Sequence, residues 1–336
     1  MMLRVLLRPP PAAFQSSLGF LAAYCVDKMS EIEINDHDFQ SLKDKVILIT
    51  GGSSGIGLKT AFLAAQQGAK VVVGDINPLT ADVEGRNIVY VPLNVTSWPS
   101  QSEYFRKAYE LHGRIDHVFA NAAVAPDENF LDEKFDEDGQ LKQPNYRTMD
   151  VGQKGVIDTV FLALHYMKKQ PTGGSIVITS SVAGIVSFPV PDYSVAKHAV
   201  FGLMRSIDYN MARTYPKIRC NAVAPSWTES GLVPPALAEL GAVVQPPEAV
   251  ARVVALLMAD GARRGQTVYI HDGKAAEVGA ALYDAVVKNC PAVPGPECIG
   301  VFDKMKSWVA FEEEQRRKGE QTKERVDEQQ EGVRTG

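Results

Sequence analysis

Cysteine is scarce in this chain, with four among 336 residues, and this scarcity excludes two common kinds of framework. No two cysteines form a CxxC pair, and no cysteine–histidine cluster has the spacing of metal ligands, so we expect no structural metal. Cys290 and Cys298 flank a proline-rich stretch and could pair, but so few cysteines are more typical of a reducing compartment. We therefore expect reduced thiols, with Cys220 in the core, and a cytoplasmic location.

An excess of positive charge is also missing. The 35 lysines and arginines are outnumbered by 40 acidic residues, which gives a net charge of −5. No basic face is implied, so a nucleic-acid partner is not expected. Hydrophobic residues make up 45% of the chain and charged residues 22%, which is ordinary for a globular protein with a sizeable buried core.

Long hydrophobic runs are absent as well. In the atypical residues 1–28, the apolar run 18–26 is too short to span a bilayer. This segment has two arginines and no acid before Asp27, so it fits either a mitochondrial presequence or an upstream extension with Met29 as the true start. The low arginine content and the lack of an amphipathic repeat favour the extension. A genuine presequence would move the expected location to mitochondria.

The rest of the chain divides into a domain at 29–290 and a charged tail at 291–336. Within the domain, apolar runs rich in β-branched residues alternate with helical patterns. We expect strands at 46–50, 71–75, 88–93, 115–120, 175–179, 218–223 and 267–270, and helices at 56–67, 103–111, 145–168, 192–213 and 248–259. This alternation predicts an α/β fold: a Rossmann-like, doubly wound parallel sheet of about seven strands with helices on both faces.

A glycine-rich turn follows the first predicted strand and opens the first helix. Glycines let the backbone approach a pyrophosphate closely, and the helix N-terminus supplies free N–H groups. The flanking strand and helix are the context that gives such a pattern meaning. The residues expected to bind a dinucleotide here are Gly51, Ser53, Ser54, Gly55, Ile56 and Gly57.

Asp75 ends the second strand. A carboxylate at this point can accept hydrogen bonds from the adenosine ribose hydroxyls and would repel a 2′-phosphate. No lysine or arginine lies in the glycine turn or directly after Asp75. The cofactor expected is therefore NAD(H), with an NADPH-dependent reductase as a lesser alternative.

Tyr193 and Lys197 lie four residues apart at the start of a predicted helix, and hence on one face. They follow a strand and a serine-rich turn that contains Ser180 and Ser181. A phenol with a pKa near 10 is a poor base at neutral pH, and a nearby ammonium would lower that pKa. A serine hydroxyl could orient the substrate oxygen. The set predicts proton transfer on a carbinol or carbonyl oxygen.

The order TGxxxGxG, NAG-like, SSxxG, YxxxK and AP resembles the short-chain dehydrogenase/reductase family, in its NAD-preferring, fungal-type branch, over residues 43–275. The resemblance implies that Tyr193 is the general acid/base, that Lys197 binds the ribose and that Ser181, rather than Ser180, positions the substrate.

The resemblance also extends to residues around the adenosine. It implies that Asn94 and Val95 contact the adenine, with the Asn94 amide oxygen in place of the family's usual aspartate. Asn121 matches the asparagine under the adenosine. Thr228 or Ser230 would contact the nicotinamide carboxamide, although Pro225-Ser226 replaces the usual Pro-Gly.

One departure bears on catalysis. Gly152 stands where the family usually has an asparagine that holds a proton-relay water. Glycine has no side chain for that role and weakens a helix by about 1 kcal/mol relative to alanine. The sequence therefore supports two hypotheses: an NAD(H)-dependent oxidoreductase, or a non-catalytic dinucleotide-binding protein with a regulatory role.

The substrate is indicated only by hydrophobic residues. Residues 231–237, which match the family's lid, are mostly apolar, and Phe188, Val190 and Trp227 add to this character. We expect a hydrophobic secondary alcohol or its ketone. The family habit of pairing the helices at 145–168 and 192–213 predicts a homodimer or homotetramer.

Overall fold

The computed structural model describes residues 31–126, 130–234 and 236–282. The chain divides into two compact units, residues 1–280 and 281–336, and the elements described here belong to the first. The predicted boundaries at 28/29 and 290/291 lie outside the described residues, as do Cys25, Cys290 and Cys298. No helix in the described ranges is long and apolar enough to cross a membrane.

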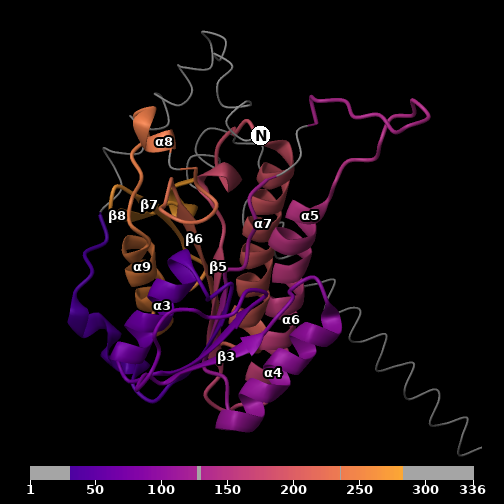
Figure 1. The fold of residues 1–336 in the computed structure, drawn as a ribbon. Coiled ribbons are helices and arrows are strands. Elements are labelled where there is room, and N and C mark those ends of the chain that lie inside the picture. Colours follow the sequence, from indigo (N-terminus) through magenta and orange to yellow (C-terminus); the bar gives the residue numbers. More distant parts are fainter. Residues whose placement is uncertain (1–30, 127–129, 235, 283–336) are drawn as a thin grey trace, which may run out of the picture. The chain divides into compact units, whose positions relative to one another are not determined.

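Eight strands form one sheet in the order β3-β2-β1-β4-β5-β6-β7-β8 (Figure 1). The strands are β1 (Val46–Thr50), β2 (Lys70–Asp75), β3 (Ile88–Pro92), β4 (His117–Ala120), β5 (Gly174–Thr179), β6 (Ile218–Pro225), β7 (Thr267–His271) and β8 (Lys274–Glu277). All neighbours are parallel except β7 and β8. The predicted doubly wound sheet is confirmed, and its order reverses between β1 and β4.

Strand β8 is the one strand of the described residues that the sequence analysis did not predict. Its sequence, KAAE, has no β-branched or aromatic residue, so nothing in its composition marks a strand. It forms because Asp272 and Gly273 take positive φ angles of 50° and 74° and fold the chain back onto β7 in a tight hairpin. Tertiary pairing, rather than local preference, creates this strand.

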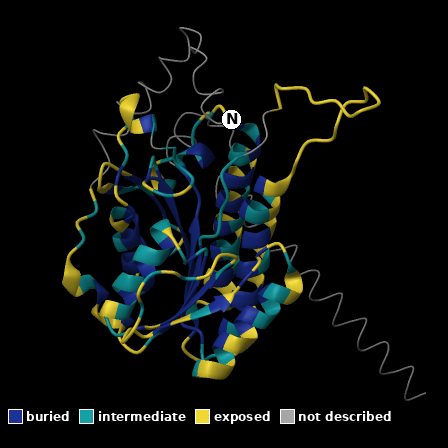
Figure 2. Cartoon of the chain, in the orientation of Figure 1, coloured by how far each residue is buried: buried dark blue, intermediate teal, exposed yellow. Residues whose placement is uncertain are grey.

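Helices cover both faces of the sheet (Figure 1). On one face lie α4 (Trp98–His112), α6 (Gly155–Met167) and α7 (Pro191–Thr214), and on the other lie η1 (Asp36–Leu42), α3 (Gly55–Gln66) and α9 (Pro247–Ala259). Each face has its own hydrophobic core, and the central strands β1, β4, β5 and β6 between them are almost wholly buried (Figure 2). This two-sided burial explains why the strands are continuous apolar runs.

Helix α4 starts earlier than predicted. It begins at Trp98 instead of residue 103, because Ser97 caps it by accepting a hydrogen bond from the Ser100 N–H at 3.4 Å, and Pro99 lies in its first turn. It ends at Gly113, whose φ of 72° is left-handed. These capping signals were present in the sequence but lie outside the periodic apolar pattern on which the prediction relied.

The helix predicted at 145–168 is divided. It consists of the short α5 (Arg147–Met149), the π-helical turn η2 (Asp150–Lys154) and α6. A π turn adds one residue to a helix without a clear change in hydrophobic period, so hydrophobic periodicity does not predict it. Gly152 is buried within this turn.

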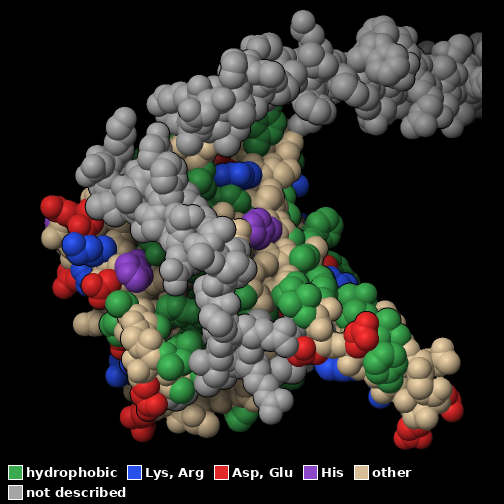
Figure 3. Space-filling view, turned by 90° about the horizontal axis from the view of Figure 1, so that it is seen from above, with side chains coloured by type: hydrophobic (Ala, Val, Ile, Leu, Met, Phe, Trp, Pro, Cys, Tyr) green, Lys and Arg blue, Asp and Glu red, His purple; other side chains and the backbone are tan. Residues whose placement is uncertain are grey.

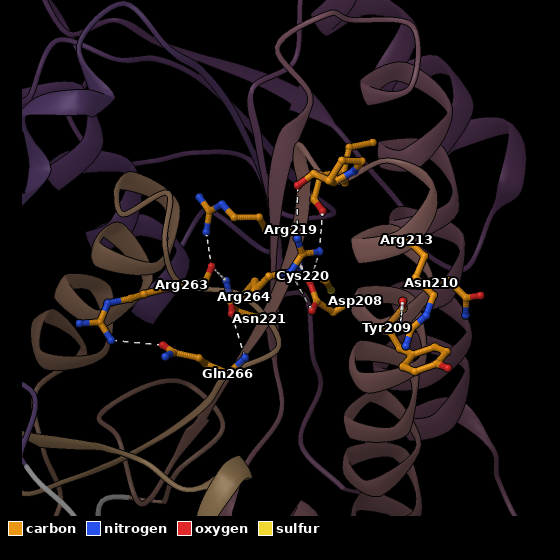
Figure 4. A network of polar contacts seen from close by, with 12 residues as sticks. Asp208, Tyr209, Asn210, Arg213, Arg219, Cys220, Asn221, Arg263, Arg264 and Gln266 are labelled. Carbon is orange, nitrogen blue, oxygen red and sulfur yellow. Dashed lines mark hydrogen bonds and ion pairs between the residues drawn. The ribbon is translucent and has the colours of Figure 1, made fainter. Parts of the chain in front are cut away.

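A polar network fixes α7 to β6 near the amino end of that strand (Figure 4). The Asp208 carboxylate on α7 accepts from the Cys220 N–H at 3.1 Å and from Arg264 at 3.2 Å. Arg219 donates to the carbonyl oxygens of Leu257 and Met258 in α9, on the other face of the sheet. Cys220 is fully buried, as expected. The network therefore holds the far end of the helix whose first turn carries Tyr193.

Tyr104 links α4 to the centre of the sheet. Its ring is fully buried, and its hydroxyl accepts from the Ile49 N–H at 3.1 Å and donates to the Val72 carbonyl at 2.7 Å. Gly74 lies against this ring, since a Cβ there would come within 2.8 Å of it. The hydroxyl thus joins β1, β2 and α4 at one point.

We predict that Tyr104→Phe lowers the free energy of unfolding by about 1 kcal/mol, because it removes the hydrogen bonds that the buried hydroxyl makes with the backbone of β1 and β2. Urea unfolding would measure this loss. Tyr215→Phe, at an exposed position, is the control and should change stability little. Equal stability of the two variants would contradict the role given to the Tyr104 hydroxyl.

Candidate active site

A cleft of about 770 Å³ opens at the carboxyl ends of the parallel strands. Segments that follow β1, β2, β3, β4, β5 and β6 all contribute to its lining. This is the position in which doubly wound sheets bind ligands, next to the point where the strand order reverses. Its location matches the expectation from the glycine turn and the Tyr193–Lys197 pair.

An exposed arm, residues 130–146, leaves the unit at one side of this cleft. Figure 3 looks onto this end of the molecule and shows hydrophobic and acidic side chains along the arm. An isolated bridge between Phe135 and Leu141 closes it into a narrow loop. Asn145, at its end, lines the cleft, so the base of the arm forms part of the rim.

The glycine turn connects β1 to α3. Gly51 and Gly55 have φ angles of 66° and 50°, which side chains rarely allow. A Cβ on Gly51 would lie 2.7 Å from the Ala122 backbone, and one on Gly57 would lie 2.2 Å from the Gly51 carbonyl oxygen. Of the six predicted residues, Gly51, Ser54, Gly55 and Ile56 line the cleft, whereas Ser53 and Gly57 lie outside the lining.

Asp75 lies at the cleft end of β2. One carboxylate oxygen accepts from the Ser53 N–H at 3.1 Å and the other from the Asn77 N–H at 3.0 Å. Ser53 therefore orients the carboxylate instead of facing the cleft itself. A carboxylate has about four acceptor positions, so Asp75 can still accept two further hydrogen bonds.

Asn94 and Val95 both line the cleft. The Asn94 amide oxygen accepts from the backbone N–H and the hydroxyl of Thr96, at 3.0 and 2.8 Å. The Asn94 amide oxygen, which we expected to accept a hydrogen bond from the adenine, thus already accepts two hydrogen bonds from Thr96. Val95 is held by Gln101, a buried residue that sequence reasoning missed and whose amide donates to the carbonyls of Val95 and Gly155 at 2.7 and 2.9 Å.

Asn121 cross-links three strand ends. Its amide nitrogen donates to the carbonyl oxygens of Thr50 and Gly51 at 3.2 and 3.0 Å. Its amide oxygen accepts from the Thr179 hydroxyl at 3.0 Å. The residue lines the cleft, but its polar atoms bond to the protein and fix the glycine turn relative to β5.

Ser181, Tyr193 and Lys197 converge on the same cleft. Ser181 follows β5 and accepts from the Ala183 N–H at 3.2 Å, and Tyr193 stands in the first turn of α7. Lys197, one turn later, is 2% exposed, and its ammonium donates to the Thr179 carbonyl at 2.9 Å. The ammonium lies 5.4 Å from the centre of the Tyr193 ring.

Burial is the main cause of the shifted pKa values of Tyr193 and Lys197. It raises the pKa of the Tyr193 phenol above 10, an effect partly offset by a hydrogen bond with Ser181. It lowers the pKa of the Lys197 ammonium to about 8. From the sequence we expected a lowered pKa for Tyr193, and the structure does not show one. The reason is that desolvation of the phenol outweighs any stabilisation of its anion.

Gly152 faces α7 beside these residues. A Cβ at this position would meet the Ala196 Cβ at 3.7 Å, which is an ordinary contact. The position therefore has room for at least one side-chain atom. Two buried oxygens, Thr148 Oγ1 four residues before Gly152 and Asp192 Oδ2 next to Tyr193, have no hydrogen-bond partner within the described residues. Bound water commonly satisfies such atoms.

Thr228 and Ser230, the two candidates for the carboxamide, differ in their surroundings. The buried Thr228 hydroxyl donates to the Ser226 carbonyl at 3.0 Å and accepts from the Gln245 amide at 3.2 Å. The Ser230 Cβ would be 3.3 Å from a Cβ on Gly55, so Ser230 lies directly against the glycine turn. Both line the cleft, as do Leu232 and Val233 of the expected lid.

Of the three hydrophobic residues expected beside the substrate, Phe188, Val190 and Trp227, one does not line the cleft. Phe188 and Trp227 line the cleft and are half-buried. Val190 does not: it is 4% exposed and packs as the residue before α7. Val190 therefore packs in the protein interior and does not line the cleft, and its proposed contact with substrate is withdrawn.

The shifted Lys197 pKa has a consequence for stability. At neutral pH, folded and unfolded chains both carry the proton, and the folded chain bears the cost of a buried charge. As the pH rises above 8, the folded chain loses this proton before the unfolded chain does, so the cost declines. Between about pH 7 and 9.5, wild type should gain about 2 kcal/mol of unfolding free energy relative to Lys197→Met.

Urea unfolding of the two proteins at both pH values tests this prediction. Other titrating groups are common to the pair and cancel in the comparison. The same pH dependence in wild type and Lys197→Met would show that the ammonium is not buried as described.

Comparison with known proteins now identifies the architecture. The family described as short chain dehydrogenase matches residues 45–240. The chain is 46% identical to the short-chain dehydrogenase/reductase ascJ of Acremonium egyptiacum, over 76% of this chain and 87% of that protein. It is 37% identical to the short-chain dehydrogenase/reductase prx4 of Penicillium roqueforti, over 61% of each chain, so it spans less than two thirds of that relative.

Two solved structures agree with this match. A short-chain type dehydrogenase/reductase from Mycobacterium marinum superimposes with a TM-score of 0.62 at 26% identity, over 71% of this chain and 98% of that one. Levodione reductase gives a TM-score of 0.58 at 25% identity, over 69% and 97%. The sequence match spans the glycine turn and the Ser181–Tyr193–Lys197 group alike, and the chain belongs to the short-chain dehydrogenase family.

Proposed function

We propose that this protein is an NAD(H)-dependent oxidoreductase that interconverts a hydrophobic secondary alcohol and its ketone, with Tyr193 as general acid/base. The observation that carries the proposal is the convergence of Ser181, Tyr193 and the buried Lys197 on the cleft that also contains the glycine turn. Isolated YxxxK patterns are common, but burying an ammonium beside a phenol costs free energy, and such buried ionisable groups are typical of functional sites.

The residues fit a nicotinamide dinucleotide. The positive φ angles of Gly51 and Gly55 and the close backbone approaches around them leave a surface without side chains at the N-terminus of α3, where a pyrophosphate would be held. Asp75 would accept from the ribose hydroxyls, and Thr228 or Ser230 would contact the carboxamide. When bound, the nicotinamide supplies or takes up the hydride.

The chain's own residues would manage the proton. In alcohol oxidation, the Tyr193 oxygen accepts the hydroxyl proton, and in ketone reduction it returns a proton to the same oxygen. Ser181 donates to the substrate oxygen and keeps it within reach of the phenol. The Lys197 ammonium, which uses one donor on Thr179, has two left for a ribose hydroxyl, and its charge favours the phenolate during transfer.

A non-catalytic dinucleotide-binding protein is the second candidate, because Gly152 offers no side chain to hold a relay water. The room beside Ala196 makes the question testable by restoring the asparagine. The exposed Ile157, Phe161 and Val195 on α6 and α7 support the proposal of a homodimer or homotetramer through these helices. A cytoplasmic location stays a prediction.

Asp75 provides a test of the cofactor. Wild type should bind NADH more tightly than NADPH, and Asp75→Ala should weaken NADH binding roughly tenfold or more, because two charge-assisted hydrogen bonds are lost. Fluorescence titration with both cofactors measures this. Asp82→Ala, at an exposed carboxylate outside the cleft, is the control and should bind as wild type does. Tighter binding of NADPH by wild type would reject the NAD(H) preference.

Turnover tests the chemistry. With NAD⁺ and a panel of lipophilic secondary alcohols, Tyr193→Phe should lose at least about a hundredfold in kcat, because the proton has no acceptor, and should still bind NADH. Tyr215→Phe should remain active. If wild type binds NADH but turns over nothing, and only Gly152→Asn is active, the binding-protein hypothesis replaces the enzyme.

A further inference from the structure

An aromatic wall runs from Tyr193 along one side of the cleft. The ring centre of Phe188 lies 6.4 Å from that of Tyr193 and 5.7 Å from that of Trp227, with an interplanar angle of 50° in each pair. Phe188 and Trp227 come from segments before α7 and after β6, and both are half-buried. Each ring therefore keeps part of its surface for a further contact, directly beside the phenol.

The backbone on either side of Trp227 is fixed by Gln245. Its N–H donates to the Trp227 carbonyl at 3.0 Å, and its carbonyl accepts from the Glu229 N–H at 2.9 Å. Its side chain, 2% exposed, donates to the Thr228 hydroxyl at 3.2 Å and the Ile270 carbonyl at 3.0 Å.

The Gln245 side-chain oxygen accepts from the Gly273 N–H at 3.1 Å, in the hairpin between β7 and β8. The backbone and the side chain of Gln245 together thus connect the loop of Trp227 to the β7–β8 hairpin at the edge of the sheet. On the other side, the Ser194 hydroxyl donates to the Phe188 carbonyl at 3.4 Å. Both backbone segments of the wall are thus fixed by the protein's own hydrogen bonds, which reduces the entropy lost on binding.

The lining next to the wall is uncharged. Segments 182–188 and 225–233 contribute only neutral side chains among the described lining residues. Leu232 and Val233 add aliphatic surface there, and the polar side chains of these two segments are the hydroxyls of Ser226, Thr228 and Ser230. A charged group on the substrate would find no partner along this wall.

We propose that the substrate carries a flat, uncharged aromatic ring close to its reacting carbon, and that Phe188 and Trp227 select it. The proposal rests on the function proposed above, since it places the reacting oxygen at Tyr193. A ring bonded at or near that carbon would lie within reach of both the Phe188 and the Trp227 rings. Aromatic pairs are attractive beyond the area that they bury, and two such contacts predict roughly a tenfold preference for an aromatic over a saturated ring.

Equilibrium binding tests this without relying on turnover. The full-length protein saturated with NAD⁺ is titrated by calorimetry with 2-acetylnaphthalene and with its fully saturated analogue. A ketone and NAD⁺ together hold no transferable hydride, so only binding is measured. Wild type should bind the aromatic ketone about tenfold more tightly. Phe188→Leu and Trp227→Leu should each reduce this ratio severalfold, whereas Trp227→Phe should retain most of it.

Phe161→Leu, on the exposed face of α6, is the matched control and should keep the wild-type ratio. Equal binding of the two ketones by wild type, no binding of either, or an unchanged ratio in both leucine variants would overturn the proposal. Turnover of the corresponding alcohols is then measured separately. An aromatic preference in binding without turnover would uphold the selection of an aromatic ring by Phe188 and Trp227 and reject the enzymatic function.

Discussion

The two halves of the site are joined through the side-chain amide of Asn121. On one side it holds the carbonyl oxygens of Thr50 and Gly51, where the glycine turn begins. On the other it accepts from the Thr179 hydroxyl, and the Thr179 carbonyl in turn accepts from Lys197. A short chain of hydrogen bonds therefore fixes the distance between the place expected for a pyrophosphate and the ammonium beside Tyr193. Hydride transfer requires cofactor and substrate to meet in one geometry, so this connection is a precondition for everything else.

The same arrangement has a cost in stability. Lys197 is buried, with a single acceptor among the residues that the structure describes, and its lowered pKa expresses the free energy lost by removing an ammonium from water. Tyr193 is desolvated in the same place. Such costs are tolerated at functional sites because the surrounding structure compensates for them. Here the Asp208 network and the hydrophobic core on the same face of the sheet hold α7 in place, so its first turn need not stabilise itself.

The sequence predicted those parts of the site whose signals are local. The strand–turn–helix at Gly51–Gly57 and the four-residue spacing of Tyr193 and Lys197 are patterns within one element, and the order of strands and helices follows from hydrophobic periodicity. These predictions placed the cleft correctly before any contact was known.

The residues that sequence reasoning missed act over long range. Gln101 and Gln245 hold backbone groups far away in the chain, and a single glutamine in a helix or loop gives no sign of such a role. The π turn around Gly152 leaves the hydrophobic period almost unchanged, and β8 exists only because β7 is beside it. Val190 and Phe188 look equivalent in sequence, but the chain bends between them, and only Phe188 lines the cleft while Val190 is buried.

Gln245 also bears on how this protein can diverge. It holds the loop of Trp227 through backbone groups and small hydroxyls, and not through the indole ring. The hydrogen bonds that hold this loop are thus independent of the side chain at position 227. Under the proposed function, that side chain can change in the course of evolution and a descendant can acquire a new substrate, while the backbone around it and the residues around Tyr193 keep their places.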